Sequence, residues 1–399
     1  MSKVVQIPDG WVKGSLSSFT ECFSGGTPSR SKSEFYEGTI PWVKSGEVNN
    51  RFIYDTEEKI SESAIRESSA KLVNPNSILV AMYGATAGKV AVLKVLAATN
   101  QAVLAMNPVD SNLCSDFLFW VMEYEAVRLM KKVQGAAQPN LSKNLIGNHK
   151  VTLPQLPEQK AIADLLSTWD EAIEKTERLI QAKVRQKLGE LHSRISSQKA
   201  NSTIGSFAKP VVRKVDKPEE SYVAMGIRSH FKGTFQRLVE DPRTVNMDSL
   251  YRVKENDLIL NITFAWEGAI ALVKKEDEEC YVSHRFPTYE IKRSKAEPCF
   301  IRQLIMSSRM KYDLSNISPG GAGRNRVLNK KDFLKMPIWL PDLETQKNIG
   351  EYLGAIDNEI DLLKQLADKY KTQKRGLMQK MLTGEWRVKP EIVNQYMEA

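Results

Sequence analysis

The sequence LPQLPEQK at residues 153–160 recurs as LPDLETQK at residues 340–347, an offset of 187 positions. A weaker similarity, at an offset of 180, precedes each copy and relates residues 73–79 to residues 253–259. The longer offset continues without a gap into the residues that follow, where it aligns Ile162 with Ile349, Leu166 with Leu353, and Asp170 with Asp357. Self-similarity at a fixed offset is the mark of repeated structural units, so we predict two copies of one unit.

Apolar residues follow each Leu-Pro segment at alternating steps of four and three, which is the seam of a coiled coil. A straight helix over Glu158–His192 would be about 52 Å long at 1.5 Å per residue. Near its end the first seam continues through either Lys187 or Leu188. An ordinary helical hairpin or dimerisation segment has the same spacing, but we favour a spacer because each helix follows its own globular unit. The seam residues expected to face a partner helix are Ile162, Leu166, Trp169, Ile173, Ile180, Ile349, Leu353, Ile356, Ile360, Leu363, Tyr370 and Leu377.

The rest of the chain has the pattern of mixed domains. Short apolar runs such as residues 77–82 and 258–260 predict strands, and helical spacing predicts helices at residues 116–131 and 298–312. We therefore predict an α+β fold, in which a globular domain followed by a long helix occurs twice. The predicted boundaries are 1–150 for the first globular domain, 151–195 for the central helix, 196–335 for the second globular domain, 336–390 for the C-terminal helix and 391–399 for a tail.

Composition narrows the class of protein. The 57 Lys and Arg residues exceed the 48 Asp and Glu residues, and the net charge of +9 favours a polyanionic partner, although a basic surface also serves solubility. The four cysteines lie far apart without a CxxC pair, so we expect neither a zinc site nor a disulfide framework. The N-terminus lacks the pattern of a secretory signal, and no apolar run approaches 18 residues. We expect a cytoplasmic protein without a membrane segment.

Catalytic motifs are incomplete in this sequence. Residues 84–89, GATAGK, are one residue short of a phosphate-binding P-loop, and Val90 stands where the magnesium-binding hydroxyl belongs. Nothing matches the Asn/Asp-Pro-Pro-aromatic loop of an adenine methyltransferase, and Glu57-Glu58-Lys59 is only a weak match to a nuclease motif. The four histidines are scattered. We expect no catalytic residue, no metal and no cofactor in this chain.

Polar and basic loops are the candidates for contacts with DNA. Glycine and backbone N–H groups suit close approach to phosphates, Arg suits guanine or phosphate, and Asn and Gln suit adenine edges. Each candidate could instead belong to a solvated surface turn or form a structural ion pair. The candidates in the first domain are Gly25, Gly26, Thr27, Pro28, Ser29, Arg30, Lys32, Lys44, Lys89, Gln138, Asn140 and Lys143; those in the second are Arg228, His284, Arg285, Arg324, Asn325 and Arg326.

Four features of the sequence together resemble the specificity subunits of type I restriction-modification systems. They are the Gly25–Ser29 loop, the segment Ile40–Glu47, the duplicated Leu-Pro helix starts and the closing Leu382-Thr383-Gly384. The resemblance covers nearly the whole chain. It implies a pseudo-twofold internal repeat, with two target recognition domains separated by two long antiparallel helices. The second domain has Ala208–Val211 where a copy of the Gly-Gly-Thr-Pro loop would lie, so the role of that loop is not carried across.

The resemblance also implies partners. Each domain would bind one half of a bipartite site in double-stranded DNA, with an unread spacer set by helix length. The helices would dock two modification subunits, which bind S-adenosylmethionine and methylate adenine, and restriction subunits with motor and nuclease activity would join the complex. A coiled-coil DNA-binding scaffold outside restriction, or a fused methyltransferase or nuclease, is the alternative.

Overall fold

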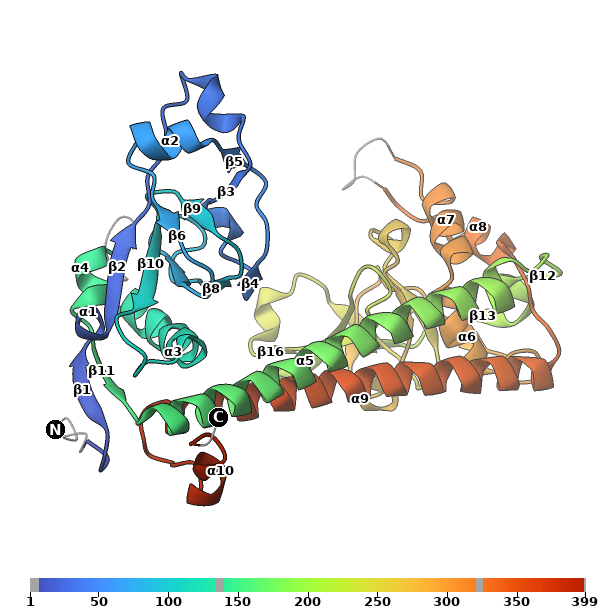
Figure 1. The fold of residues 1–399 in the computed structure, drawn as a ribbon. Helices are drawn as coiled ribbons and strands as arrows, with labels where there is room; N and C mark the ends of the chain where they lie inside the picture. The colour runs from blue at the N-terminus through green and yellow to red at the C-terminus, as the bar shows by residue number, and fades with distance from the viewer. Residues whose placement is uncertain (1–6, 134–139, 321–325, 398–399) are drawn as a thin grey trace. The chain divides into compact units, whose positions relative to one another are not determined.

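The computed structural model describes residues 7–133, 140–320 and 326–397. They form two compact units, one of Met1–Lys175 with Ala367–Ala399 and the other of Thr176–Leu366. Each unit contains one mixed α and β domain together with part of each long helix (Figure 1). The predicted α+β fold, with two globular domains and two long helices, is confirmed.

The first domain is built on two small sheets. The apolar run at its centre, β7 (Ile78–Ala81), is buried at every position because both of its faces are covered. Ile78 and Val80 pack toward helix α3 (Ser115–Val133), whereas Leu79 and Ala81 face an apolar cluster shared with the second sheet. The strand orders are β2 (Thr20–Ser24), β10 (Val103–Pro108), β7 (Ile78–Ala81), β8 (Val90–Leu93) and β4 (Phe52–Ile53) in one sheet, and β5 (Lys59–Ile60), β3 (Ile40–Val43), β9 (Ala97–Thr99) and β6 (Leu72–Val73) in the other.

The second domain repeats this topology. Its hairpin pairs Leu258 with Leu272, as the first domain pairs Ile78 with Val92, 180 positions earlier. A parallel pair joins β15 to β20, as it joins β3 to β9 in the first domain. The strand orders are β13 (Ala208–Val211), β21 (Thr288–Ile291), β18 (Leu258–Leu260) and β19 (Ile270–Leu272), and β14 (Lys214–Asp216), β17 (Ser249–Arg252), β20 (Tyr281–Val282), β15 (Tyr222–Ile227) and β16 (Thr234–Val239).

The two long helices are α5 (Leu156–Leu191) and α9 (Leu343–Leu382). Within the second unit they run antiparallel, since Lys183 pairs with Glu359 and, further along α5, Lys187 pairs with Asp357. Gly384, in the left-handed region at φ 72°, follows the last turn of α9, where glycine commonly ends a helix.

A buried glutamine fastens the start of each long helix to its own domain. The Gln159 side-chain amide donates to the carbonyl oxygens of Asn112 and Pro154, and its oxygen accepts from the Cys114 N–H. Gln346, 187 positions later, makes the equivalent bonds to Lys295, Pro341 and Glu297. The repeated glutamine therefore has a structural role in both copies.

The smaller elements complete each domain. One prediction was wrong: residues 298–312 form two helices, because the chain turns at Met306 and Ser307 caps a new helix by accepting the Met310 N–H. No helix of the described residues is both long and apolar enough to cross a membrane. The remaining helices and strands are β1 (Val12–Ser15), α1 (Leu16–Phe19), α2 (Glu62–Glu67), α4 (Lys143–Gly147), β11 (Lys150–Leu153), β12 (Ser202–Thr203), α6 (Pro298–Ile305), α7 (Ser308–Asn316), α8 (Lys330–Lys335), β22 (Pro337–Ile338) and α10 (Pro390–Asn394).

Candidate nucleic-acid interface

Three loops of the first domain meet at one end of its sheets. The turn at Ser45–Glu47, which follows β3, is held against the β7–β8 turn because Thr86 Oγ1 donates to the Ser45 carbonyl oxygen at 2.7 Å. Gly84 and Gly88 allow the tight β7–β8 turn by adopting left-handed φ angles of 88° and 81°. Lys89 immediately precedes β8 and is exposed.

The third loop precedes α4. The Leu141 N–H donates to the Met82 carbonyl oxygen at 2.8 Å, so this loop ends beside the β7–β8 turn. Asn140 and Lys143, both exposed, flank Leu141. The structure therefore brings Asn140 to the same loop cluster as Lys89, whereas Gln138 lies outside the described residues.

The second domain builds the same cluster from different side chains. Ser229 Oγ donates to Glu267 at 2.7 Å, and the Phe231 N–H donates to the Gly268 carbonyl oxygen at 3.0 Å, which joins the loop after β15 to the β18–β19 turn. The Leu328 N–H donates to the Ile262 carbonyl oxygen at 2.9 Å. This bond is the counterpart of the Leu141–Met82 bond, because Leu328 lies 187 positions after Leu141 and Ile262 lies 180 positions after Met82.

Two predicted cations converge on the β18–β19 turn. The Arg326 guanidinium lies 5.0 Å from the Trp266 ring centroid, a cation–π contact. The Arg285 guanidinium donates to Thr263 Oγ1 at 3.3 Å. Arg324 and Asn325 lie outside the described residues. Arg326 beside the Trp266 indole and Arg285 on Thr263 present guanidinium donors and a stacking surface, the groups that bind phosphates and guanine edges.

Arg228 and His284 lie near this cluster without joining it by a hydrogen bond. The Arg228 guanidinium donates to the Thr234 carbonyl oxygen at 2.9 Å and covers the Phe235 ring, which is a structural contact. His284, next to Arg285, is exposed. The sequence missed Trp266, because an isolated tryptophan carries no motif that distinguishes a surface ring from a core one.

The Gly25–Ser29 loop is packed against its own domain. A Cβ on Gly25 would lie 1.9 Å from the Thr99 carbonyl oxygen, and one on Gly26 would lie 2.3 Å from Ser69 Oγ. The Trp42 indole N–H donates to the Gly26 carbonyl oxygen at 3.1 Å. The glycines therefore serve close approach of this loop to β9. Thr27 donates to Gln101, the Pro28 carbonyl oxygen accepts from Tyr36, and Ser29 bonds Ser31.

Glutamates pair with the three cations near this loop. Arg30 and Lys44 contact Glu58 at 2.7 Å and 3.0 Å, and Lys32 contacts Glu67 at 2.9 Å. The Lys44 hydrogen bond, with a further bond from Arg30, holds the pKa of Glu58 below its usual value, although partial burial opposes this. Arg30 remains 57% exposed and lies over the Tyr36 ring at 4.1 Å. These cations are tied into a surface network and still present charge to solvent.

The predicted helix seam is buried in two ways. Trp169 packs edge-on against Tyr370, with ring centroids 5.6 Å apart, between the helices. Other seam residues pack into the globular cores, Ile162 and Leu166 into the first and Ile349, Leu353, Ile356 and Ile360 into the second. Ile173 is buried, Ile180 packs against the second core, Leu377 packs against the first, and Leu363 is half-buried.

Two ion pairs interrupt this seam at equivalent positions. Lys374 bonds Asp170 in the first unit, and Lys187 bonds Asp357 in the second. The sequence left Lys187 and Leu188 as alternatives. Lys187 takes the buried position, and Leu188 is 59% exposed.

Arg51 is a functional candidate that the sequence missed. Its guanidinium bonds Asp170 at 3.1 Å and Ser167 at 2.8 Å, and it lies 4.6 Å from the Trp120 ring centroid. It thereby fastens the first domain to α5. The sequence does show an aspartate, Asp170, repeated as Asp357 within an apolar stripe, which indicates that each carboxylate has a partner. It does not show that Arg51 is a partner of Asp170.

Groups of three or more His, Cys, Asp or Glu side chains that suit a metal ion are absent from the part of the chain that the structure describes. The loop clusters offer hydrogen-bond donors, guanidinium groups and aromatic rings, which are groups that bind a ligand such as a nucleic acid.

A family model described as type I restriction modification DNA specificity domain matches residues 8–184 and 216–371. The chain belongs to this family. Each matched segment of the specificity domain family begins in or before one globular domain and ends within the long helix that follows it.

Relatives of known name agree with this family. The type I restriction enzyme MjaVIII specificity subunit of Methanocaldococcus jannaschii is 24% identical over 425 residues, 96% of this chain and 95% of that protein. The EcoR124I/EcoR124II specificity subunit of Escherichia coli is 32% identical over 155 residues, 37% of this chain and 38% of that protein. The crystal structure of the S subunit from M. genitalium matches with a TM-score of 0.59 at 14% identity, covering 96% of this chain and 98% of that one, and so shares the fold.

Proposed function

We propose that this chain is the DNA specificity subunit of a type I restriction-modification complex and that each globular domain recognises one half of a bipartite site. The duplicated loop cluster carries this proposal. The same three loops meet in both domains. One of the hydrogen bonds that join them, Leu141 N–H to Met82, recurs in the second domain as Leu328 N–H to Ile262. A duplicated binding surface matches a target with two parts.

The side chains on the two clusters differ, which supports an asymmetric site. The first cluster presents Lys89, Asn140 and small residues, whereas the second presents Arg285, Arg326 and Trp266. Asn recognises adenine edges and Arg recognises guanine edges most often, so the two half-sites are expected to differ in sequence. The same basic side chains would also bind phosphates, which gives affinity that falls steeply with salt.

The long helices are proposed to dock two modification subunits, one for each repeat. The same internal contacts recur in the two units, which supports this stoichiometry because a repeated architecture offers two similar places for a partner. In this scheme the modification subunits hold S-adenosylmethionine and methylate adenine, and restriction subunits join to cleave. The chain itself would have no catalytic role and would act in the cytoplasm.

Methylation mapping tests the function. The chain is co-expressed with its modification subunits, and methylated bases in the host genome are located by single-molecule sequencing. We expect methyladenine in a split motif with an unread gap, and no methyl transfer by the purified chain alone with S-adenosylmethionine. A single uninterrupted motif, or activity of the chain alone, would contradict the proposal.

A further inference from the structure

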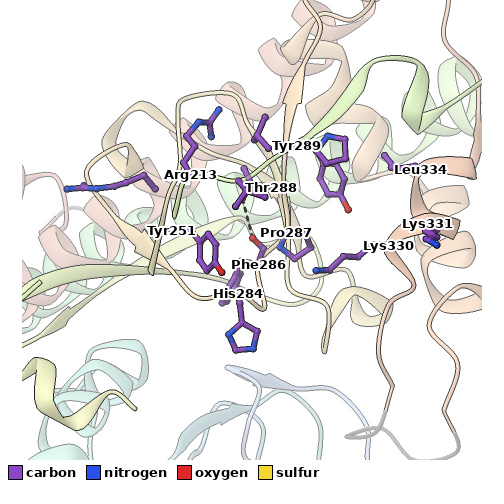
Figure 2. Close-up of a pocket in the computed structure, with 14 residues that line it drawn as sticks. Arg213, Tyr251, His284, Phe286, Pro287, Thr288, Tyr289, Lys330, Lys331 and Leu334 are labelled. Carbon is purple, nitrogen blue, oxygen red and sulfur yellow. Dashed lines mark hydrogen bonds between the residues drawn. The ribbon is translucent and has the colours of Figure 1, made fainter. Parts of the chain in front are cut away.

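The second domain contains a pocket with a chemistry that the loop cluster does not explain. Its volume is about 420 Å³, and it lies beside β13, β21 and α8 (Figure 2). Among the fourteen described residues that line it, five are basic and none is acidic. The pocket therefore favours a ligand that carries negative charge.

Two of the five basic residues already have partners. Arg213 pairs with Asp257 through both guanidinium nitrogens, and Arg252 lies 3.9 Å from the Tyr281 ring centroid while donating to the Glu279 carbonyl oxygen. Within the described chain, His284, Lys330 and Lys331 make no ion pair. The ammonium groups of Lys330 and Lys331 are thus available to an anion at the pocket.

The pocket wall is mainly apolar and aromatic. Tyr251 and Phe286 line it together with proline, valine and leucine side chains. Figure 2 shows Tyr251 and His284 on one side of the labelled group, and Tyr289 and Lys330 on the other. Rings of this kind offer faces on which a flat apolar body can stack.

Tyr289 places an unused hydroxyl at this pocket. Its side chain is only 2% exposed and packs on Phe333, with ring centroids 5.2 Å apart. No described group forms a hydrogen bond with its hydroxyl, and burial raises the pKa of Tyr289 to about 12, so the group stays protonated. A hydroxyl that lines the pocket and has no partner in the protein can form a hydrogen bond with a ligand or water there.

The first domain has no counterpart to this hydroxyl. Met106 pairs with Ile78 on the neighbouring strand, and Tyr289 pairs with Leu258, the residue 180 positions after Ile78. Met106 therefore occupies the position equivalent to Tyr289, and it is fully buried in the core. The tyrosine gives the second domain a polar group where the first has a thioether.

We propose that this pocket binds a single nucleotide, with its base against Tyr251 and Phe286 and its phosphate at Lys330 and Lys331. A nucleotide combines the flat ring, the hydrogen-bonding edge and the negative charge that the walls, Tyr289 and the lysines match. It belongs either to a DNA strand or to the free nucleotide pool. Only the first source rests on the proposed function.

Fluorescence of 2-aminopurine, which is quenched when the base stacks, tests the proposal with the full chain. The two probes are free 2-aminopurine deoxynucleoside monophosphate and a single-stranded oligonucleotide with one 2-aminopurine. Quenching of either probe that weakens in the pocket variants supports the proposal, and the probe that responds identifies the source.

The pocket variants are Tyr289→Phe, Leu334→Trp and the double variant Lys330→Glu with Lys331→Glu. Tyr289→Phe loses one hydrogen bond and should weaken binding roughly five-fold. It keeps the ring packing, so it tests the pocket even if Leu334→Trp fails to fold. The lysine reversal should weaken binding more than about ten-fold. Lys335→Glu is the control, because Lys335 is exposed on the same helix and does not line the pocket.

Two results would overturn the proposal: no quenching of either probe at millimolar protein or ligand, or quenching that is equal in wild type and all pocket variants. The outcome is separable from that of the proposed function. If the variants in the complete complex still direct methylation to the wild-type split motif, the specificity function stands whatever the pocket binds.

Discussion

The Lys187 ammonium bonds the Asp357 carboxylate, and both groups have counterparts 187 residues away. Asp357 corresponds to Asp170 and Lys187 corresponds to Lys374, which form the same pair in the first unit. In the second unit Gln303 also donates to Asp357 at 3.1 Å, whereas in the first Arg51 takes that role on Asp170. The repeat thus preserves one Lys–Asp ion pair between the long helices. The further donor to the aspartate differs, being Gln303 in the second unit and Arg51 in the first.

Removing the cation from this pair should destabilise the second unit. Lys187→Met leaves the Asp357 carboxylate, 33% exposed, with only Gln303, and should lower the free energy of unfolding by about 2 kcal/mol. Urea denaturation measures the loss. The double variant Lys187→Met with Asp357→Leu should recover much of it. The matched control is Lys364→Met, which breaks an exposed pair with Asp361 and should cost less than about 0.5 kcal/mol. Equal losses for both lysines would refute the assignment.

Arg51 should hold the first domain on α5. Arg51→Met removes bonds to Asp170 and Ser167, and we expect a loss of about 1 to 3 kcal/mol with faster amide hydrogen exchange at residues 163–170. Arg66→Met, on the exposed surface of α2, is the control. Unchanged exchange in Arg51→Met would mean that the domain is held by apolar packing alone.

The glycines of the Gly25–Ser29 loop should be intolerant of any side chain. Gly25→Ala places Cβ 1.9 Å from the Thr99 carbonyl oxygen, and the resulting backbone shift should cost about 2 kcal/mol or more. Gly46→Ala is the matched control, because nothing lies within 4 Å of its added Cβ. Thermal unfolding compares them; a Tm drop in both or in neither would contradict the packing role.

Acid should weaken the Glu58 network. Its folded pKa is held below the ordinary 4.5, so its contribution to stability is complete above pH 4.5 and is lost as pH falls through the folded value. The Tm difference between wild type and Glu58→Gln should therefore be constant from pH 7 to about 5 and shrink below pH 4.5. A difference that persists unchanged to pH 3 would show that the carboxylate charge contributes nothing.

Arg326 should affect one half-site only. Arg326→Ala, assayed within the complete complex, is expected to relax base preference in the second half-site and to weaken binding about ten-fold, the usual effect of losing a base contact. Mapping of methylated bases measures it. Arg243→Ala, which alters an arginine with a 90% exposed side chain in the same domain, should leave the motif intact. An unchanged motif together with weaker binding would instead place Arg326 on phosphates.

Sequence reasoning succeeded where the determining contacts are local. The long helices follow from heptads, and strands β7 and β18 follow from the apolar runs at residues 77–82 and 258–260. It failed over residues 298–312, where unbroken helical spacing hid the Ser307 cap.

Contacts between distant residues could not be predicted. Arg51 meets Ser167 and Asp170 more than a hundred positions away, and Gly25 meets Thr99 only because of the strand order. Neither contact leaves a periodic signal in the sequence. Loop positions were predicted, but which loops meet was not.

The glutamines at the helix starts have a consequence for handling the protein. Gln159 and Gln346 are buried and neutral, so their six hydrogen bonds to backbone groups are insensitive to ionic strength and to titration. Phosphate contacts respond in the opposite way, since added salt displaces them. A high-salt wash should therefore strip nucleic acid from the purified chain while each domain stays fastened to its helix.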